Sequence, residues 1–225
     1  MAPIKFTYFP LRARGFVSRA LLVVSGAEWV DDRVSPEAWA EKKGTTPFGQ
    51  VPLLEDEDVG VLAQSDAINR HLARKFGLAG KGIKEQALVD QAYEEANDLL
   101  NQVIKTLFSG ATEEGKATLL TTTIPKHVGH IKTLLEANGN NGFLVGDSLT
   151  VADIQAFHVL NNWARPWGPE AVAPLQSYLD GVRKANAALS KWISEGSLCP
   201  TTAPGWVPIV KFLNKPEQFE GEFAN

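Results

Sequence analysis

The side chains best suited to chemistry stand at the end of the first predicted strand. Alternating apolar and polar residues predict a strand over residues 4–8. Tyr8 therefore carries its hydroxyl at the carboxyl end of a strand, where α/β sheets place ligands. Arg14 follows at the start of the next predicted helix and offers a cation toward the same region. On the residues alone, a core aromatic and an exposed helix charge remain alternatives for this pair. The neighbouring Arg12 and Arg19 are interpreted as surface charges.

A second polar pair precedes another predicted helix. Ser65 is placed as the N-cap of a helix over residues 65–76, which Gly77 closes. A helix N-terminus carries free N–H groups and positive dipole character, so it suits a carboxylate ligand. The Gln64 side-chain amide would add a further donor. The alternative is a cap with only a structural role.

The sequence offers little for metal or redox chemistry. Cys199 is the only cysteine, so no intrachain disulfide and no cysteine-based metal cluster can form. His127 and His130 are three residues apart on a predicted helix, a spacing that suits chelation, but neither a cysteine partner nor an HExxH pattern accompanies them. We therefore expect no metal site. Asp153, three residues after Thr150, is interpreted as part of a helix-capping box rather than as a catalyst.

The sequence predicts two kinds of domain around these residues. The first part of the chain reads β-α-β-α-β-β-α, with elements predicted over residues 4–8, 15–25, 29–34, 35–43, 51–55, 59–63 and 65–76. Residues 79–84 are typical of a linker, and only helices are predicted beyond it, over residues 87–108, 112–137, 150–163, 174–185 and 186–194. The fold class is therefore α/β plus all-α, with a sheet domain over residues 1–78 and a helical domain over residues 85–225.

Composition excludes several classes of protein. With 44% hydrophobic and 21% charged residues in a chain of 225, disorder and fibrous repeats are ruled out. The net charge of −4 indicates no general basic surface for nucleic acid or anionic lipid. No apolar run approaches the ~20 residues that cross a bilayer, and the first residues predict a strand rather than a signal sequence. We expect a cytoplasmic protein that binds neither nucleic acid nor membranes.

Several short motifs together carry a resemblance to a known family. They are Thr7-Tyr8-Phe9 with Arg14, Trp39 with Lys43, Pro47-Phe48-Gly49-Gln50-Val51-Pro52-Leu53-Leu54-Glu55, Leu62-Ala63-Gln64-Ser65-Asp66-Ala67-Ile68, and Gly146-Asp147-Ser148-Leu149-Thr150-Val151-Ala152-Asp153. In combination they resemble a cytosolic glutathione transferase, most similar to the sigma class that includes the glutathione-dependent prostaglandin D synthases. The resemblance covers about residues 3–195. It implies a thioredoxin-like domain that binds glutathione, a helical domain that supplies most of an apolar co-substrate pocket, and a homodimer.

The resemblance implies a detoxifying transferase that conjugates glutathione, as co-substrate, to small hydrophobic electrophiles. The nucleophile is the glutathione thiolate, and an unperturbed thiol has a pKa near ~8.5. Lowering that pKa by about two units needs roughly 2.7 kcal/mol of preferential thiolate stabilisation, which one good hydroxyl hydrogen bond and a nearby cation would supply. Tyr8 is implied as this hydroxyl and Arg14 as this cation, and both are the predicted catalytic residues.

The remaining implied roles concern glutathione binding. The resemblance assigns glutathione contacts to Tyr8, Phe9, Arg14, Trp39, Lys43, Gly49, Gln50, Val51, Pro52, Gln64, Ser65 and Asp98. Trp39, Lys43 and Gln50 are implied at the glycine end of the ligand. Gln64 and Ser65 are implied at its γ-glutamyl carboxylate, where the helix N-terminus suits a negative charge.

Two of these roles depend on features beyond a side-chain contact. The resemblance implies a cis bond before Pro52, although only ~5–6% of X-Pro bonds in folded proteins are cis. Such a turn would leave the Val51 backbone to pair with the cysteinyl residue of glutathione as an added strand; the alternative is a plain strand-starting proline. Asp98 is implied to reach the γ-glutamyl amine bound by the partner subunit, with Asn97 as the alternative if the register is offset by one, or a solvated helix face.

Two other functions stay open. One is a glutathione-dependent isomerase or peroxidase of the prostaglandin D synthase kind, although Lys105 falls where those synthases carry an aromatic residue. The other is a non-catalytic protein that keeps only the fold, against which the joint presence of the glutathione-binding residues argues. An extension from about residue 197 carries apolar residues at helical spacing. We expect it to pack along its own subunit, anchored by Trp206, either bordering the co-substrate pocket or on the far side with only a stability role.

Overall fold

A computed structural model describes residues 3–108 and 112–195 of the chain. The expectations for Cys199, Trp206 and the rest of the extension from about residue 197 lie outside these described residues. The chain forms two compact units, one made of the elements up to Phe76 together with the last described helix, and one made of residues 77–186. Among the described residues, no helix is long and apolar enough to cross a membrane.

The first unit is built on a four-stranded sheet in the order β2-β1-β3-β4. Its strands are β1 (Ile4–Tyr8), β2 (Trp29–Arg33), β3 (Leu53–Asp56) and β4 (Gly60–Ala63). β1 pairs in parallel with β2 and antiparallel with β3, and β3 pairs antiparallel with β4. β1 lies between β2 and β3 in the sheet, and four of its five residues are buried.

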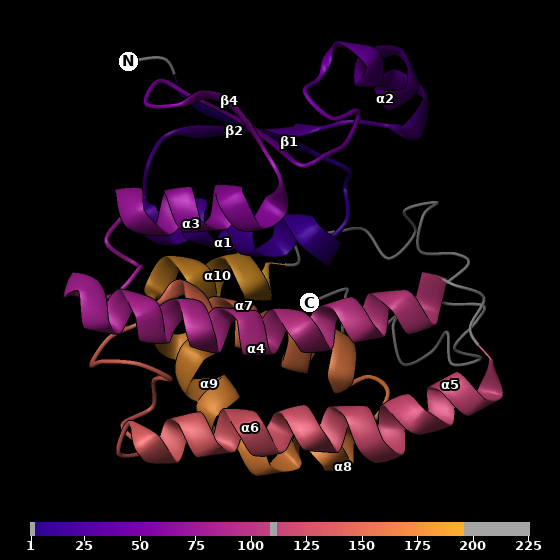
Figure 1. Cartoon of the computed structure of the whole chain (residues 1–225). Coiled ribbons are helices and arrows are strands. Elements are labelled where there is room, and N and C mark those ends of the chain that lie inside the picture. Colours follow the sequence, from indigo (N-terminus) through magenta and orange to yellow (C-terminus); the bar gives the residue numbers. More distant parts are fainter. Residues whose placement is uncertain (1–2, 109–111, 196–225) are drawn as a thin grey trace. The chain divides into compact units, whose positions relative to one another are not determined.

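Two helices of this unit lie beneath the sheet, a third lies apart from it, and a fourth packs on one of the first two. α1 (Phe16–Ser25) and α3 (Ser65–Lys75) pack side by side beneath the strands, whereas α2 (Pro36–Lys42) lies away from them (Figure 1). The last described helix, α10 (Ala187–Ser194), packs on α1. α1 ends at Gly26, whose φ of 67° is left-handed and favours glycine.

A buried acidic residue joins the far end of β3 to α3. Asp56 accepts hydrogen bonds from Lys75 Nζ (2.7 Å) and His71 Nε2 (2.8 Å), and Lys75 Nζ also lies 2.6 Å from Asp58. Burial by itself raises the pKa of the Asp56 carboxyl. The hydrogen bonds from Lys75 and His71 outweigh that effect and hold this pKa below its ordinary value.

The second unit is entirely helical in its described residues. It contains α4 (Gly82–Phe108), α5 (Glu113–Thr118), the π-helical turn η3 (Leu119–Thr123), α6 (Ile124–Ala137), α7 (Val151–Val159), the π-helical turn η4 (Leu160–Ala164), α8 (Pro169–Val172), η5 (Ala173–Leu175) and α9 (Gln176–Lys184). α4 packs against both α6 and α7. α4 begins within the expected linker, and the expected helix over residues 112–137 is divided at η3. Pro125, which lacks an N–H, is the second residue of α6, immediately after Ile124.

The predicted capping box at the start of α7 is present. Asp153 is completely buried, and its carboxylate accepts hydrogen bonds from the Thr150 N–H (2.9 Å) and the Thr150 hydroxyl (2.9 Å). It also accepts from the Leu144 N–H (2.8 Å) and the Tyr178 hydroxyl (3.1 Å). Burial raises the pKa of Asp153, and these four donors oppose the rise. The residue therefore ties three segments together and has the structural role that its position predicts.

Candidate active site

The tyrosine at the end of β1 is held in a close-packed setting. Tyr8 is the last residue of β1 and is only 6% exposed. Its ring lies 6.4 Å from the ring of Phe6 and 5.8 Å from that of Phe9, centroid to centroid. The Tyr8 carbonyl accepts the Val34 N–H at 3.1 Å, which fixes the end of the strand against the segment after β2. The position of this hydroxyl is thus set by the sheet and by neighbouring rings.

Gly15 lies close against the Tyr8 ring. A Cβ atom added at Gly15 would lie 2.4 Å from Tyr8 Cδ1 and 2.9 Å from Tyr8 Cε1, far inside ordinary contact. The backbone at Gly15 has a φ of −89°, which any residue adopts, so the requirement is one of space. Only a residue without a side chain lets the start of α1 lie this close to the Tyr8 ring. No sequence pattern predicted this role for Gly15.

Arg19 and Arg12, expected as surface charges, are both buried. Arg12 is 6% exposed and Arg19 is completely buried. Arg19 Nε donates to Asp31 Oδ1 (2.9 Å), and its two terminal nitrogens donate to the carbonyls of Leu11 (2.9 Å) and Phe9 (3.1 Å). An arginine bonded at three points replaces the solvent that it loses on burial. The surface expectation was therefore wrong for both residues.

The Arg19 guanidinium also bears on Tyr8 directly. Its central carbon lies 5.7 Å from the centroid of the Tyr8 ring and 5.3 Å from that of Phe6. At such distances the cation is attracted to the ring faces. Arg19 thus holds the segment that follows β1 through two carbonyls and supports the tyrosine ring at the same time.

Arg14, the predicted cation, comes directly before Gly15 in the sequence. It lies in the short 3₁₀ turn η1 (Ala13–Gly15), is half-buried, and immediately precedes the glycine that packs on Tyr8. The predicted cation is therefore adjacent in sequence to Gly15, the residue that lies against the Tyr8 ring.

Phe9 and Trp39 are brought together, as a shared ligand surface requires. Their rings meet edge to face with centroids 6.4 Å apart, and both side chains are half-buried. Trp39 is fixed by α2, whose N-cap Ser35 accepts the Ala38 N–H at 3.2 Å. Lys43 follows directly after α2 and is exposed.

The turn before β3 collects further predicted residues. Gly49 has a left-handed φ of 61°, and the Val51–Pro52 bond is cis, as the resemblance implied. Val51 lies outside β3, and within the described residues its backbone groups make no backbone hydrogen bond. The Gln64 side-chain amide donates to Gln50 Oε1 at 3.5 Å, and both side chains are exposed. The structure therefore assembles this group from two separate stretches of sequence.

The start of α3 differs from the expectation. Gln64, not Ser65, is the N-cap, and it makes no side-chain capping bond. Ser65 is the first helical residue and is 8% exposed. Gln64 has φ 75° and ψ 115°, a backbone conformation that residues other than glycine rarely adopt. The prediction of Ser65 as N-cap was wrong, because the backbone of Gln64 is the last non-helical one and the helix begins at Ser65. An uncapped helix start beside an exposed amide suits an anionic ligand.

Asp98 belongs to the helical unit. It is exposed on α4, whereas Asn97 is 4% exposed and bonds Glu94 (3.2 Å) and the Gln155 amide (3.5 Å). The inward contacts of Asn97 argue against the offset alternative, so Asp98 is the residue of this pair that faces solvent. The other predicted glutathione ligands all lie in the sheet unit.

Two family models match the chain. The one described as the glutathione S-transferase N-terminal domain matches residues 4–74, and the one described as the glutathione S-transferase C-terminal domain matches residues 97–196. The chain belongs to the glutathione S-transferase family. This assignment confirms the predicted fold class, a thioredoxin-like sheet unit and an all-helical unit, and makes the protein a transferase.

Curated relatives agree with this assignment. The chain is 40% identical to the probable glutathione S-transferase 7 of Caenorhabditis elegans over 160 residues, which cover 68% of this chain and 77% of the relative. It is 34% identical to glutathione S-transferase 1 of Ascaris suum over 214 residues, which cover 89% of this chain and all of the relative.

Solved structures of glutathione S-transferases and of a prostaglandin synthase are similar to this one. A pi-class enzyme of Onchocerca volvulus superposes with a TM-score of 0.81 at 27% identity, covering 90% of this chain and 98% of that one. A monomeric glutathione S-transferase of Necator americanus gives 0.76 at 33% identity, with coverages of 86% and 97%. Prostaglandin synthase D of Nilaparvata lugens gives 0.74 at 28%, with coverages of 85% and 97%. Because these neighbours differ in kind, the family is shown and the class within it is not.

Proposed function

We propose that this transferase conjugates the thiolate of glutathione to small hydrophobic electrophiles, with the Tyr8 hydroxyl as the donor that stabilises the thiolate. The supporting observation is the setting of Tyr8 at the end of β1, where its ring packs on Gly15 and lies beside Arg19. A hydroxyl held in place donates to a thiolate without first losing rotational freedom, so its hydrogen bond is available for lowering the thiol pKa. Arg14, one residue from Gly15, adds positive charge.

The sheet unit offers donors for each part of glutathione. The Val51 backbone, which makes no backbone hydrogen bond within the described residues, serves as the partner strand for the cysteinyl residue. Gln64 and Ser65 at the start of α3 bind the γ-glutamyl carboxylate. The glycine end of glutathione is held by the aromatic face of Trp39, the ammonium group of Lys43 and the side-chain amide of Gln50, beside Gly49. Phe9 packs on Trp39. Thiolate attack on an electrophilic carbon uses glutathione as co-substrate and needs no metal ion.

A glutathione-dependent isomerase or peroxidase is the second candidate. The observation that favours it is the likeness to the prostaglandin synthase of Nilaparvata lugens, together with the motifs that resemble the sigma class. Both candidates share the thiolate and differ in what it attacks. Turnover with aryl halides and enones supports conjugation, whereas turnover confined to hydroperoxides or a prostaglandin endoperoxide supports the second candidate. Lack of turnover together with lack of retention on immobilised glutathione supports a protein that keeps only the fold.

We further propose that the enzyme works in the cytoplasm, in detoxification, as a homodimer in which Asp98 of one subunit serves the glutathione bound by the other. Its exposure on α4 supports this role for Asp98. The related structure described as monomeric makes light scattering of this protein at micromolar concentration the direct test.

The decisive experiment for the thiolate role is Tyr8→Phe, which removes one oxygen and keeps the packed ring. Turnover with a substrate limited by chemistry should fall more than tenfold, equivalent to about 1.4 kcal/mol, while glutathione affinity is kept. The pKa of bound glutathione, followed by thiolate absorbance, should rise toward ~8.5. Tyr93→Phe, which removes a hydroxyl from a buried tyrosine on α4, is the matched control. Unchanged turnover in Tyr8→Phe would remove the basis of the proposal.

A further inference from the structure

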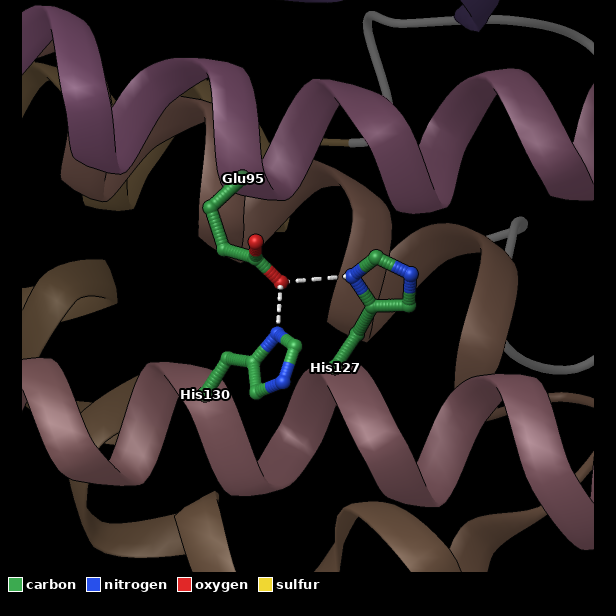
Figure 2. Close-up of side chains that lie close together, drawn as sticks. All are labelled: Glu95, His127 and His130. Atoms are coloured by element: carbon green, nitrogen blue, oxygen red, sulfur yellow. Dashed lines mark hydrogen bonds and ion pairs between the residues drawn. The ribbon is translucent and has the colours of Figure 1, made fainter.

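The helical unit holds a second cluster of chemically capable side chains, separate from the candidate active site. Glu95 on α4 faces His127 and His130 on α6 (Figure 2). Its Oε1 lies 2.6 Å from His127 Nδ1 and 2.7 Å from His130 Nδ1, so both imidazoles point at one carboxylate oxygen. We propose that Glu95, His127 and His130 form a binding site for a divalent transition-metal ion of the zinc type.

The donor set fits such an ion. Two imidazole nitrogens and one carboxylate oxygen are one of the ligand sets that Zn²⁺ takes at sites with three protein ligands and one open position. The three donor atoms lie within 4.8 Å of one another. Tetrahedral bonds of about 2.0–2.1 Å place neighbouring donors about 3.3 Å apart, so the present hydrogen-bonded separations must widen by about 0.7 Å. That adjustment is small for side chains on two packed helices.

The three side chains differ in their exposure to solvent, which suits both holding an ion and admitting it. The His127 side chain is 4% exposed, that of Glu95 is 23% exposed and that of His130 is 47% exposed. The buried His127 keeps one ligand fixed, while His130 lets an ion enter from solvent and leaves room for water as the fourth ligand. Within the described residues, the carboxylate of Glu95 is bonded only to these two imidazoles.

A second cluster of similar composition shows what distinguishes this site. Asp56, Asp58 and His71 also bring three donor atoms together. There, however, the Lys75 ammonium lies 2.7 Å from Asp56 and 2.6 Å from Asp58, so a built-in cation already occupies the centre. Around Glu95 the described part of the chain supplies no such cation. Of these two clusters, the Glu95 cluster is therefore the one in which a metal ion would supply the positive charge.

Gln102 orients the buried imidazole and adds a testable element. Its amide nitrogen lies 2.9 Å from His127 Nε2 and also donates to the Asp98 carbonyl at 3.3 Å. An amide nitrogen only donates, so His127 Nε2 accepts, and the His127 proton is on Nδ1, facing Glu95. A metal bound at Nδ1 moves that proton to Nε2, where it needs an acceptor. Gln102 is therefore a positioning residue, and a carboxylate in its place should strengthen binding.

The expectation of no metal at His127 and His130 rested on the absence of a cysteine or an HExxH pattern near them. The structure brings the third donor from α4, thirty-two residues earlier in the chain. Helix pairing, rather than local spacing, creates the site.

Titration of Zn²⁺ into the full-length, metal-free protein by calorimetry tests the proposal. The buffer must contain no glutathione, because thiolates bind zinc. We expect the wild-type protein to bind Zn²⁺ and His130→Ala, which alters an exposed residue, to bind at least tenfold more weakly. Gln102→Glu should bind more tightly than the wild type. His71→Ala, in the cluster already neutralised by Lys75, is the matched control and should bind as the wild type does.

Thermal unfolding provides a second readout that does not involve transferase activity. Zn²⁺ should raise the melting temperature of the wild type and of Gln102→Glu more than that of His130→Ala, because an ion that binds only the folded state stabilises it. Equal Zn²⁺ affinity in the wild type and His130→Ala, or no binding by the wild type, would overturn the assignment. Neither result would bear on the thiolate role of Tyr8.

Discussion

Replacement of Gly15 by alanine tests whether the setting of Tyr8 matters for chemistry. The added Cβ would lie 2.4 Å from Tyr8 Cδ1, whereas ordinary contact begins at 3.4 Å, so the ring and the helix start must separate by about 1 Å. The same Cβ would lie 2.9 Å from Arg19 Nη1. Arg19 gives way poorly because three hydrogen bonds hold its guanidinium. Most of the displacement should therefore fall on Tyr8.

Two magnitudes follow from this displacement. Overpacking of this kind costs about 1–3 kcal/mol, which at this chain length lowers the melting temperature by about 2–4 °C per kcal/mol. Misplacement of a catalytic group by about 1 Å lowers turnover by as much as 10²-fold. We therefore expect Gly15→Ala to fold, to melt a few degrees lower, and to lose roughly tenfold to a hundredfold in kcat.

The assay compares kcat, KM for glutathione and the pKa of bound glutathione in Gly15→Ala and in a matched variant. Gly181→Ala on α9 makes the same chemical change where an added Cβ has no atom within 4 Å. The matched variant should keep wild-type kinetics. If Gly15→Ala keeps both kcat and the thiol pKa of the wild type, the close approach of Gly15 to Tyr8 has no catalytic meaning and the reasoning is refuted.

Other contacts give predictions of the same kind. Asp153→Ala leaves two N–H groups and two hydroxyls without their acceptor and should lower the free energy of unfolding, measured with urea, by about 3 kcal/mol or more; an unchanged midpoint contradicts this. Because the folded-state pKa of Asp56 is depressed, its contribution is present above its unfolded pKa of about 3.8 and is lost as pH falls through the folded value. The stability advantage of wild type over Lys75→Met should therefore shrink in acid, and a constant difference from about pH 6 to pH 2 would refute the linkage. Asp98→Ala should raise KM for glutathione with little change in kcat, and a monomeric wild type by light scattering would count against that prediction.

Local patterns predicted the parts of the site that depend on neighbours in sequence. The position of Tyr8 at the end of β1 was predicted correctly, because strand alternation and the nearby Pro10 are both local signals. The capping box of Asp153 was predicted for the same reason, since cap, carboxylate and helix start lie within four residues. Ser65 shows the limit of such signals. Its type favours an N-cap, but the left-handed backbone of Gln64 moves the cap one residue earlier.

Contacts between segments far apart in the sequence could not be predicted from these local patterns. Glu95 reaches His127 only because α4 packs on α6, and Gln50 reaches Gln64 only because the turn before β3 lies beside the start of α3. Neither pair has a spacing that distinguishes it from solvent-exposed polar residues on a helix or a loop. A prediction of these contacts needs the register of the sheet and the order of helix packing, which single-sequence periodicity does not provide.

The supports of Tyr8 were nevertheless visible in part. Arg19 is the only charged residue of the ten in α1, and the stretch from Phe16 to Leu22 around it is buried throughout. A lone charge in so apolar a helix has too few exposed positions available, so burial with partners was the better expectation. Gly15 lies four residues before it, so the two share one helix face. The start of α1, from its N-cap Gly15 to Arg19, therefore presents a residue without a side chain and a fixed cation to the same tyrosine ring, which joins the packing of the helix to the chemistry proposed for the hydroxyl.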